Sequence, residues 1–177
     1  MSQAYAQITY ATAPAGAFAG MRVPSPGDIV EGRIQGEASA VVPFGYAVKR
    51  HASDATKAIL PTAETDKILG LVCHSHEYME STSYDSTATP PGVKVGANLN
   101  VLRRGKIWVL AEDAVTTAGD RGWVRCTAGS TNEYVGGITS ADEGTETIDC
   151  TKQIEFLAAV AAQALVLVEV DFTREPD

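Results

Sequence analysis

The histidine pair His74 and His76 is the best candidate for a metal site in the sequence. Alternate residues of a β-strand point to the same face, so these imidazoles share one face and Cys73 lies on the other. Two imidazoles do not complete a tetrahedral zinc site, which needs further ligands from elsewhere in the chain or from a second subunit. The acidic residues that could supply them are Asp54, Glu77 and Asp85. The spacing favours two histidines at the rim of a strand, and we predict no metal site.

Nucleophilic catalysis by cysteine needs a histidine base and an orienting group within reach of the thiol. Cys73 and His74 are neighbours in the sequence but diverge on a strand, and Cys126 and Cys150 have no local signature. The sequence also contains no Gly-x-Ser-x-Gly elbow, no phosphate-binding loop and no dinucleotide-binding fingerprint. We therefore predict a protein that is not an enzyme, with no catalytic residues and no cofactor.

Three other clusters have both a functional and a structural interpretation. The acidic segment 142–149 does not match the spacing of a calcium-binding EF-hand loop, so we predict a solvated acidic loop. Trp108 and Trp123 could stack on a sugar, but tryptophans on central strands more often belong to the core. The cations of segment 103–106 could bind an anion, but a solvated turn is the favoured interpretation.

Net charge limits the classes of partner. The chain has 177 residues and a net charge of -8, which disfavours direct contact with nucleic acid and with an anionic membrane. No segment approaches the roughly 20 apolar residues of a membrane span, and the N-terminus lacks the basic region of a signal peptide. The three cysteines have no close spacing, which indicates reduced, buried thiols. We therefore expect an intracellular origin.

The segment from Pro91 to Cys126 organises the predicted fold. It reads as three strands with two turns between them. Residues 98–101 alternate between polar and apolar, Gly105 suits a tight hairpin, and residues 107–110 run back as an apolar strand. The third strand covers residues 122–126, with Trp123 and Arg125 on one face.

Turn signals divide the rest of the chain into short strands. Strands are predicted at 29–34, 67–76 and 164–172, and a hairpin at 37–50 with its turn at 43–45. Segments 51–66 and 77–91 read as loops, and 153–160 is compatible with two helical turns or a strand. About eight strands inferred from this turn spacing favour a compact β-barrel or sandwich of short antiparallel strands.

An extended N-terminal arm precedes this domain. Residues 1–20 carry no charged side chain, and their aromatic and branched residues follow no clean period. Such a segment either lies along its own domain or docks on another molecule. We predict an arm over 1–20 and a single β-rich domain over 21–177.

The succession of turns and strands resembles the structural cement, or decoration, proteins of tailed bacteriophage capsids. The resemblance runs from about Ala17 to Phe172 and rests on PSPGDIVEGRIQGEASAVVPFGYAVKR, the strand ILGLV, NVLRRGKIWVLAEDAVTTAGDRGWVRC and the shoulder FLAAVAAQALVLVEVDF. Its motifs are turn and strand patterns, and segments 51–66 and 77–91 carry none of them.

The resemblance implies a protein that binds the outer surface of the virion capsid and reinforces contacts between major capsid protein subunits. It further implies a small symmetric oligomer, a homodimer or homotrimer, made in the host cytoplasm, with no contact to nucleic acid or membrane. On this basis the arm residues Tyr5, Ile8, Tyr10 and Phe18 are predicted to contact the capsid or a neighbouring copy.

Three alternatives remain open at this point. A phage tail or baseplate β-module would form rings or tubes in place of binding heads. A small metal-dependent hydrolase would use His74 and His76 and contain stoichiometric metal. A carbohydrate-binding β-domain would use exposed tryptophans.

Overall fold

The computed structural model of the chain describes residues 16–38, 40–75, 91–129 and 133–173. Within these ranges the chain consists of β-strands and turns, with one 3-10 turn at Gly144–Glu146, which confirms the predicted mainly β fold. The strands are β1 (Arg22–Val23), β2 (Ile29–Gln35), β3 (Val42–Pro43), β4 (Ala47–Arg50), β5 (Lys57–Ile59), β6 (Ile68–Val72), β7 (Gly92–Val93), β8 (Asn98–Ala111), β9 (Trp123–Arg125), β10 (Ile138–Thr139), β11 (Thr147–Asp149), β12 (Ile154–Phe156) and β13 (Ala164–Asp171).

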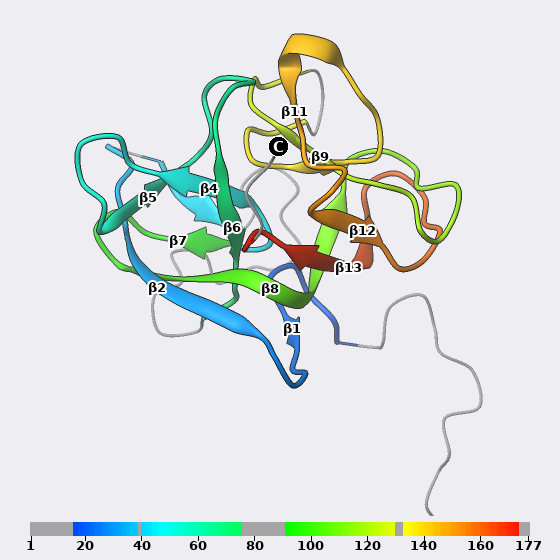
Figure 1. Ribbon diagram of the computed structural model, residues 1–177, viewed down its shortest axis with the longest axis horizontal. Coiled ribbons are helices and arrows are strands. Elements are labelled where there is room, and N and C mark those ends of the chain that lie inside the picture. The colour runs from blue at the N-terminus through cyan, green and yellow to red at the C-terminus, as the bar shows by residue number, and fades with distance from the viewer. Residues whose placement is uncertain (1–15, 39, 76–90, 130–132, 174–177) are drawn as a thin grey trace, which may run out of the picture.

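The long strand β8 connects the two halves of the fold (Figure 1). Its first half pairs with β2 and β6, and its second half pairs with β1 and β13. The hairpin predicted around Gly105 is therefore wrong, because β8 continues through this residue. Gly105 has a φ of 135°, and a Cβ there would lie 2.5 Å from the Asp28 carboxylate. Its glycine allows a bend and the close approach of Asp28, and it does not reverse the chain.

Five strands close into a barrel, which supports the barrel alternative predicted from the sequence. The order is β8-β2-β5-β4-β6, and β6 returns to pair with β8. Neighbouring strands are antiparallel except for β2 and β5, which are parallel. Figure 1 shows β2 alongside β8, with β4, β5 and β6 above them.

Two hydrophobic cores lie on either side of this barrel wall. The barrel core, between the five strands and the β3–β7 pair, consists of Val42, Phe44, Val48, Ala58, Leu69, Val72, Val93, Ala97, Leu99 and Val101. The second core lies between β8, β13 and the strands β9 to β12, and includes Ile107, Val109, Val124, Phe156 and Val168. Free Cys73, Cys126 and Cys150 are all buried in this second core, which confirms the prediction of reduced, buried thiols.

Two local predictions are corrected by strand pairing. Segment 37–50 is not a hairpin, because β3 pairs with β7 in a separate sheet while β4 pairs with β5 and β6. Segment 51–66 is not only a loop, because it contains β5. The ambiguous segment 153–160 contains a strand, β12, which pairs with β13. In the described part of the chain, no helix has the length and hydropathy that crossing a membrane requires.

Closure of the barrel depends on a glycine in β6. A methyl group at Gly70 would lie 2.3 Å from the Leu102 carbonyl oxygen and 2.9 Å from a methyl carbon of Val101. Gly70→Ala must separate β6 from β8, so we expect it to lower the free energy of unfolding by about 3 kcal/mol in urea denaturation. Gly32→Ala is the matched control, because its methyl group would meet nothing within 4 Å. Similar losses in both variants would contradict this account of closure.

Candidate functional site

Phe18 packs on its own domain. Its ring centroid lies 4.4 Å from that of His74, and the ring of Phe44 lies 4.7 Å from the same imidazole. Two residues later, the Gly20 N–H donates to the Trp108 carbonyl, and the Gly20 carbonyl accepts a hydrogen bond from the His74 N–H, both at 2.8 Å. The described end of the N-terminal arm is therefore fixed along β8 and the end of β6.

The other three residues predicted to make contacts, Tyr5, Ile8 and Tyr10, lie outside the described residues, so their role stays a prediction. The same holds for His76 of the histidine pair. The domain boundary predicted after residue 20 also stays a prediction, although the backbone of Gly20 is already bonded to the domain.

Two of the candidates for chemistry, Cys73 and Cys150, are buried thiols. Within the described ranges, no three His, Cys, Asp or Glu side chains are grouped so that they could hold a metal ion. Burial raises the pKa of Cys73 and of Cys150 to about 12. Because the thiolate is the nucleophile, neither thiol is reactive near neutral pH.

A buried arginine, Arg125, pairs with a glutamate of the acidic segment and with a glutamate from elsewhere in the chain. Arg125 of β9 is fully buried, and its Nε donates to Glu112 at 2.7 Å while its two terminal nitrogens donate to Glu143 at 2.9 and 2.7 Å. Glu133 and Glu146 lie within 3.9 Å of the same guanidinium. The prediction of a solvated loop at 142–149 is therefore wrong for Glu143, which pairs with a core cation, whereas the Glu146 side chain remains 51% exposed. Alternation along the strand did not indicate that Arg125 faces inward.

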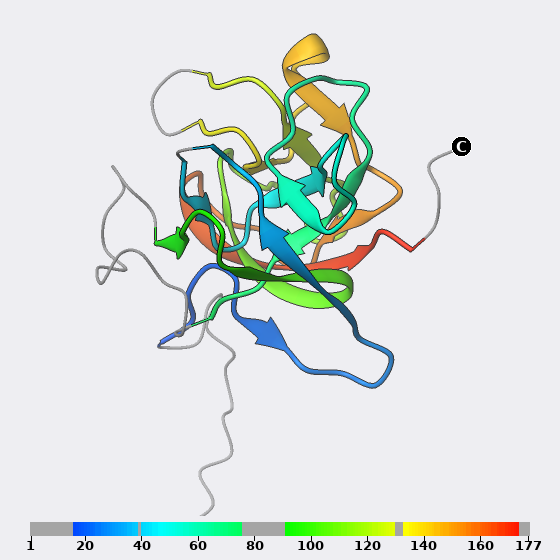
Figure 2. The ribbon, with the colours of Figure 1, turned by 90° about the vertical axis from the view of Figure 1, so that its left-hand side faces the viewer.

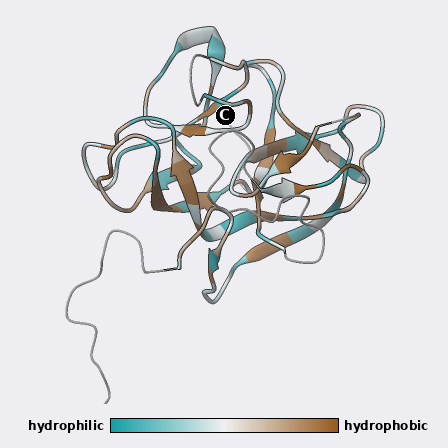
Figure 3. Ribbon diagram, turned by 180° about the vertical axis from the view of Figure 1, so that it is seen from behind, coloured by the Kyte–Doolittle hydropathy of each residue, from teal (hydrophilic) through white to brown (hydrophobic). Residues whose placement is uncertain are grey.

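Exposed hydrophobic side chains gather on β1, β2 and an adjoining turn. Among the described residues, the large hydrophobic side chains that are exposed are Val23, Ile29, Val30, Ile34 and Val95, and we call them the β2 strip. Val95 joins the strip through the neighbouring Gly96, whose N–H donates to the Gln35 carbonyl at the end of β2. In Figure 3, hydrophobic and hydrophilic stretches follow one another along β2. Figure 2 shows the turn between β1 and β2 projecting from the body.

The same strand has an unpaired backbone edge. One edge of β2 pairs with β8, and the other pairs with β5 only at Ile34 and Gln35. The Ile34 N–H donates to the Thr56 carbonyl on that outer edge, and backbone direction alternates along a strand, so Val30 and Gly32 point their polar groups the same way. No described strand pairs with them there. An open edge next to exposed apolar side chains is suited to contact with another protein.

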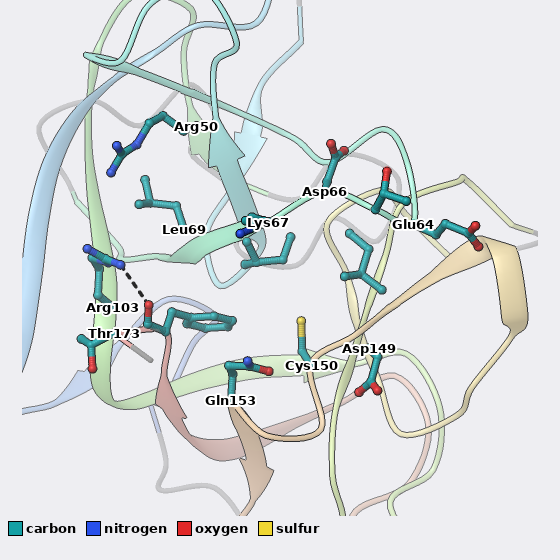
Figure 4. Close-up of a pocket in the computed structure, with 14 residues that line it drawn as sticks. Arg50, Glu64, Asp66, Lys67, Leu69, Arg103, Asp149, Cys150, Gln153 and Thr173 are labelled. Carbon is teal, nitrogen blue, oxygen red and sulfur yellow. Dashed lines mark hydrogen bonds between the residues drawn. The ribbon is translucent and has the colours of Figure 1, made fainter. Parts of the chain in front are cut away.

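A groove of about 830 Å³ opens between the barrel and the second core (Figure 4). Arg50, Leu69 and Arg103 lie on one side of it, and Glu64, Asp66 and Asp149 lie on the other. The carboxylate of Asp66 accepts hydrogen bonds from the Lys49 ammonium at 2.6 Å and from the backbone N–H groups of Thr62 and Ala63 at 2.7 and 2.9 Å. These bonds hold the rim of the groove.

The pH dependence of the free energy of unfolding tests whether the bonds of Asp66 stabilise the rim of the groove. Burial acts to raise the pKa of Asp66, but its bonds to Lys49 and the backbone outweigh burial and lower the pKa below the usual 3.8. The unfolded chain therefore binds this proton more tightly, so the stability from Asp66 is present above 3.8 and is lost as pH falls through the lower folded value. We expect Asp66→Asn to lower the free energy of unfolding by about 1–2 kcal/mol at neutral pH. In urea denaturation across pH, this deficit should shrink in acid, and a constant deficit would contradict the prediction.

Comparison with known proteins finds a family whose model matches the chain and a solved structure with the same fold. The model of a family described as structural cement protein (E217 gp24/Pam3 gp6) matches residues 6–172. A search of curated proteins found no match. A chain from a structure of the capsid of Myoviridae phage XM1 has the same fold, with a TM-score of 0.64 and 16% sequence identity, and the alignment covers 94% of this chain and 95% of that chain.

Proposed function

Because the chain belongs to the family of phage structural cement proteins, we propose that it binds the outer surface of a tailed-phage capsid and reinforces contacts between major capsid protein subunits. The family match over residues 6–172 carries this proposal. The absence of a grouped metal site in the described residues and the raised thiol pKa values are compatible with a structural role without catalysis.

The β2 strip supplies the contact with the capsid in this proposal. Its exposed side chains, Ile29 at 42%, Val30 at 39% and Ile34 at 37%, are available to be buried against a partner without disturbing either core. The open backbone edge at Val30 and Gly32 can add hydrogen bonds to an extended segment of the capsid subunit. Burial of the part of one such side chain that is still exposed contributes roughly 0.6–1.2 kcal/mol, and many copies on a repeating lattice add their effects.

The N-terminal arm supplies the second contact. Tyr5, Ile8 and Tyr10 reach the capsid or a neighbouring copy, while Phe18 anchors the arm to its own barrel. Contacts between copies would make the protein a homodimer or homotrimer on the capsid. We further propose that the protein is made in the host cytoplasm and contacts neither nucleic acid nor a membrane.

Removing residues 1–15 tests the arm without removing its anchor. Phe18 and Gly20 remain in this variant, so the domain keeps its contacts with His74 and Trp108. We expect the truncation to weaken binding to phage heads by about tenfold or more in co-sedimentation, since three apolar anchors are lost. Its thermal unfolding should match that of the full chain. Unchanged binding would show that the arm does not contact the capsid.

A further inference from the structure

Four charged side chains converge at one end of the barrel. Glu31 and Arg33 come from β2, Arg50 ends β4, and Arg103 lies on β8. We call this group the arginine mouth. Arg50 and Arg103 also line the groove, so the mouth opens directly into it (Figure 4).

The side chains of β2 in this group point into the barrel. Arg33 is the ladder partner of Leu99, and Glu31 is the partner of Val101. Directly opposite residues in a ladder lie on the same face, and Leu99 and Val101 both belong to the barrel core. The two charged side chains therefore continue the interior surface of the barrel up to its open end.

The arginine mouth has an excess of positive charge. Glu31 is its single carboxylate, forming ion pairs with Arg33 and, at 3.7 Å, with Arg103. Burial, together with repulsion from Arg50 and Arg103, lowers the pKa of Arg33. Glu31 pairs with only two of the three guanidinium groups, and Arg50 adds a further positive charge near Arg33, so the mouth has capacity for another anion.

Hydrogen bonding at this site is incomplete. Among the residues that the structure describes, the buried side-chain atoms without a hydrogen-bond partner are Glu31 Oε2, Arg33 Nε and Arg103 Nε, all in the mouth. A buried donor left without a partner destabilises the folded state, because it has lost its hydrogen bonds to water. Two of these atoms are N–H donors, which suit an oxygen acceptor from a ligand.

The charges that line the groove indicate which class of anion the arginine mouth can bind. Its far side carries Glu64, Asp66 and Asp149 opposite Arg50 and Arg103 (Figure 4). A polyphosphate chain lying in the groove would be repelled by these carboxylates, and the whole chain carries a net charge of -8. A peptide segment can place one acidic side chain in the mouth and direct other groups toward the acidic side.

We propose that the arginine mouth binds a carboxylate side chain, aspartate or glutamate, from an extended segment of the capsid subunit. The segment would run from the groove to the open edge of β2, because the mouth and the β2 strip share that strand. Identifying the capsid subunit as the partner rests on the proposed function, whereas binding of a peptide carboxylate rests on the mouth alone.

The first test uses a tetraglutamate peptide and the full chain. Titration is followed through the arginine Nε–Hε resonances in NMR spectra. We expect saturable shifts of the Arg33 and Arg103 signals that weaken with salt, and at least about tenfold weaker binding in Arg50→Glu. Arg104→Glu is the matched control, because it makes the same charge change at a 55% exposed side chain next to Arg103 in the sequence. This variant should bind within about twofold of the wild type.

Three results of this titration would overturn the inference. They are the absence of a saturable shift, equal loss of binding in both variants, and tighter binding of inorganic phosphate or a single-stranded oligonucleotide than of the peptide. The last result would assign the site to phosphate groups.

Co-sedimentation with phage heads separates the inference from the proposed function. We expect the wild type and Arg104→Glu to sediment with heads and Arg50→Glu to bind at least about tenfold more weakly. Equal binding of all three would overturn the role of the mouth in capsid contact and leave the proposed function standing. If the wild type does not sediment, the proposed function fails, and the peptide titration alone decides whether the mouth binds carboxylates.

Discussion

Replacing Arg125 with alanine is expected to lower the free energy of unfolding by about 3–5 kcal/mol. The guanidinium is fully buried and holds Glu112, which is 3% exposed, and Glu143. Without the cation, a buried carboxylate loses its charge partner, and Glu133 and Glu146 repel the others at short range. Urea denaturation followed by tryptophan fluorescence measures the loss.

The pH dependence of the Arg125→Ala variant identifies the cause. Burial already raises the pKa of Glu112, against the effect of Arg125, and removing the cation raises it further. The folded variant then binds this proton more tightly than the unfolded chain, so lowering the pH stabilises the folded state. The deficit relative to the wild type should therefore shrink between about pH 7 and pH 5.

Arg121→Ala is the control for this series. Arg121 lies near the start of the same strand, is 52% exposed, and pairs with the 40% exposed Glu155. An exposed ion pair contributes less than about 1 kcal/mol, so this variant should remain close to the wild type at every pH. If Arg125→Ala were no less stable than Arg121→Ala, the carboxylate cluster would not be a stabilising element of the second core.

Placing charges on the β2 strip is expected to abolish most of the binding to heads. The double variant Val30→Lys/Ile34→Lys changes two exposed side chains, so its unfolding should stay close to that of the wild type. In the proposed contact, however, both positions become buried. Loss of two apolar contacts, together with the cost of burying two lysine ammonium groups that have no partner, predicts at least about a hundredfold weaker binding in co-sedimentation.

Ala118→Lys is the control for the strip. Ala118 is exposed in the turn between β8 and β9, away from β2 in the order of the sheet. This variant adds a lysine without changing the strip, so it should bind heads within about twofold of the wild type. Wild-type binding by the double variant would show that another face meets the capsid.

Local sequence patterns predicted the strands that are rich in branched apolar residues, because such residues favour strands wherever their pairing partners lie. The predicted strands at 67–76 and 164–172 contain runs of branched apolar residues, and β6 and β13 fall within them. The turn signal at Gly105 failed because a positive φ is shared by hairpins and bends. The partners along both edges of β8 decide between them, and these partners come from distant parts of the chain.

The two charged clusters could not be predicted either, because their members come from distant parts of the chain. Arg125 is recognisable as a core residue only once Glu112 and Glu143, which lie 13 and 18 residues away, are folded around it. The arginine mouth combines residues of β2, β4 and β8, whereas the sequence drew attention only to the cations next to Gly105. The resemblance to cement proteins was carried by the order of turns and strands, and the family match confirms it.

The temperature at which phage heads release their DNA is a direct measure of whether this protein reinforces the capsid. Heads lacking this protein would be heated with increasing amounts of the purified full chain, and released DNA would be detected with a dye that cannot enter intact heads. A cement that binds the assembled shell better than free subunits must stabilise the shell. We expect a release temperature that rises with added protein and reaches a plateau. A release temperature that does not change at any protein concentration would contradict this expectation.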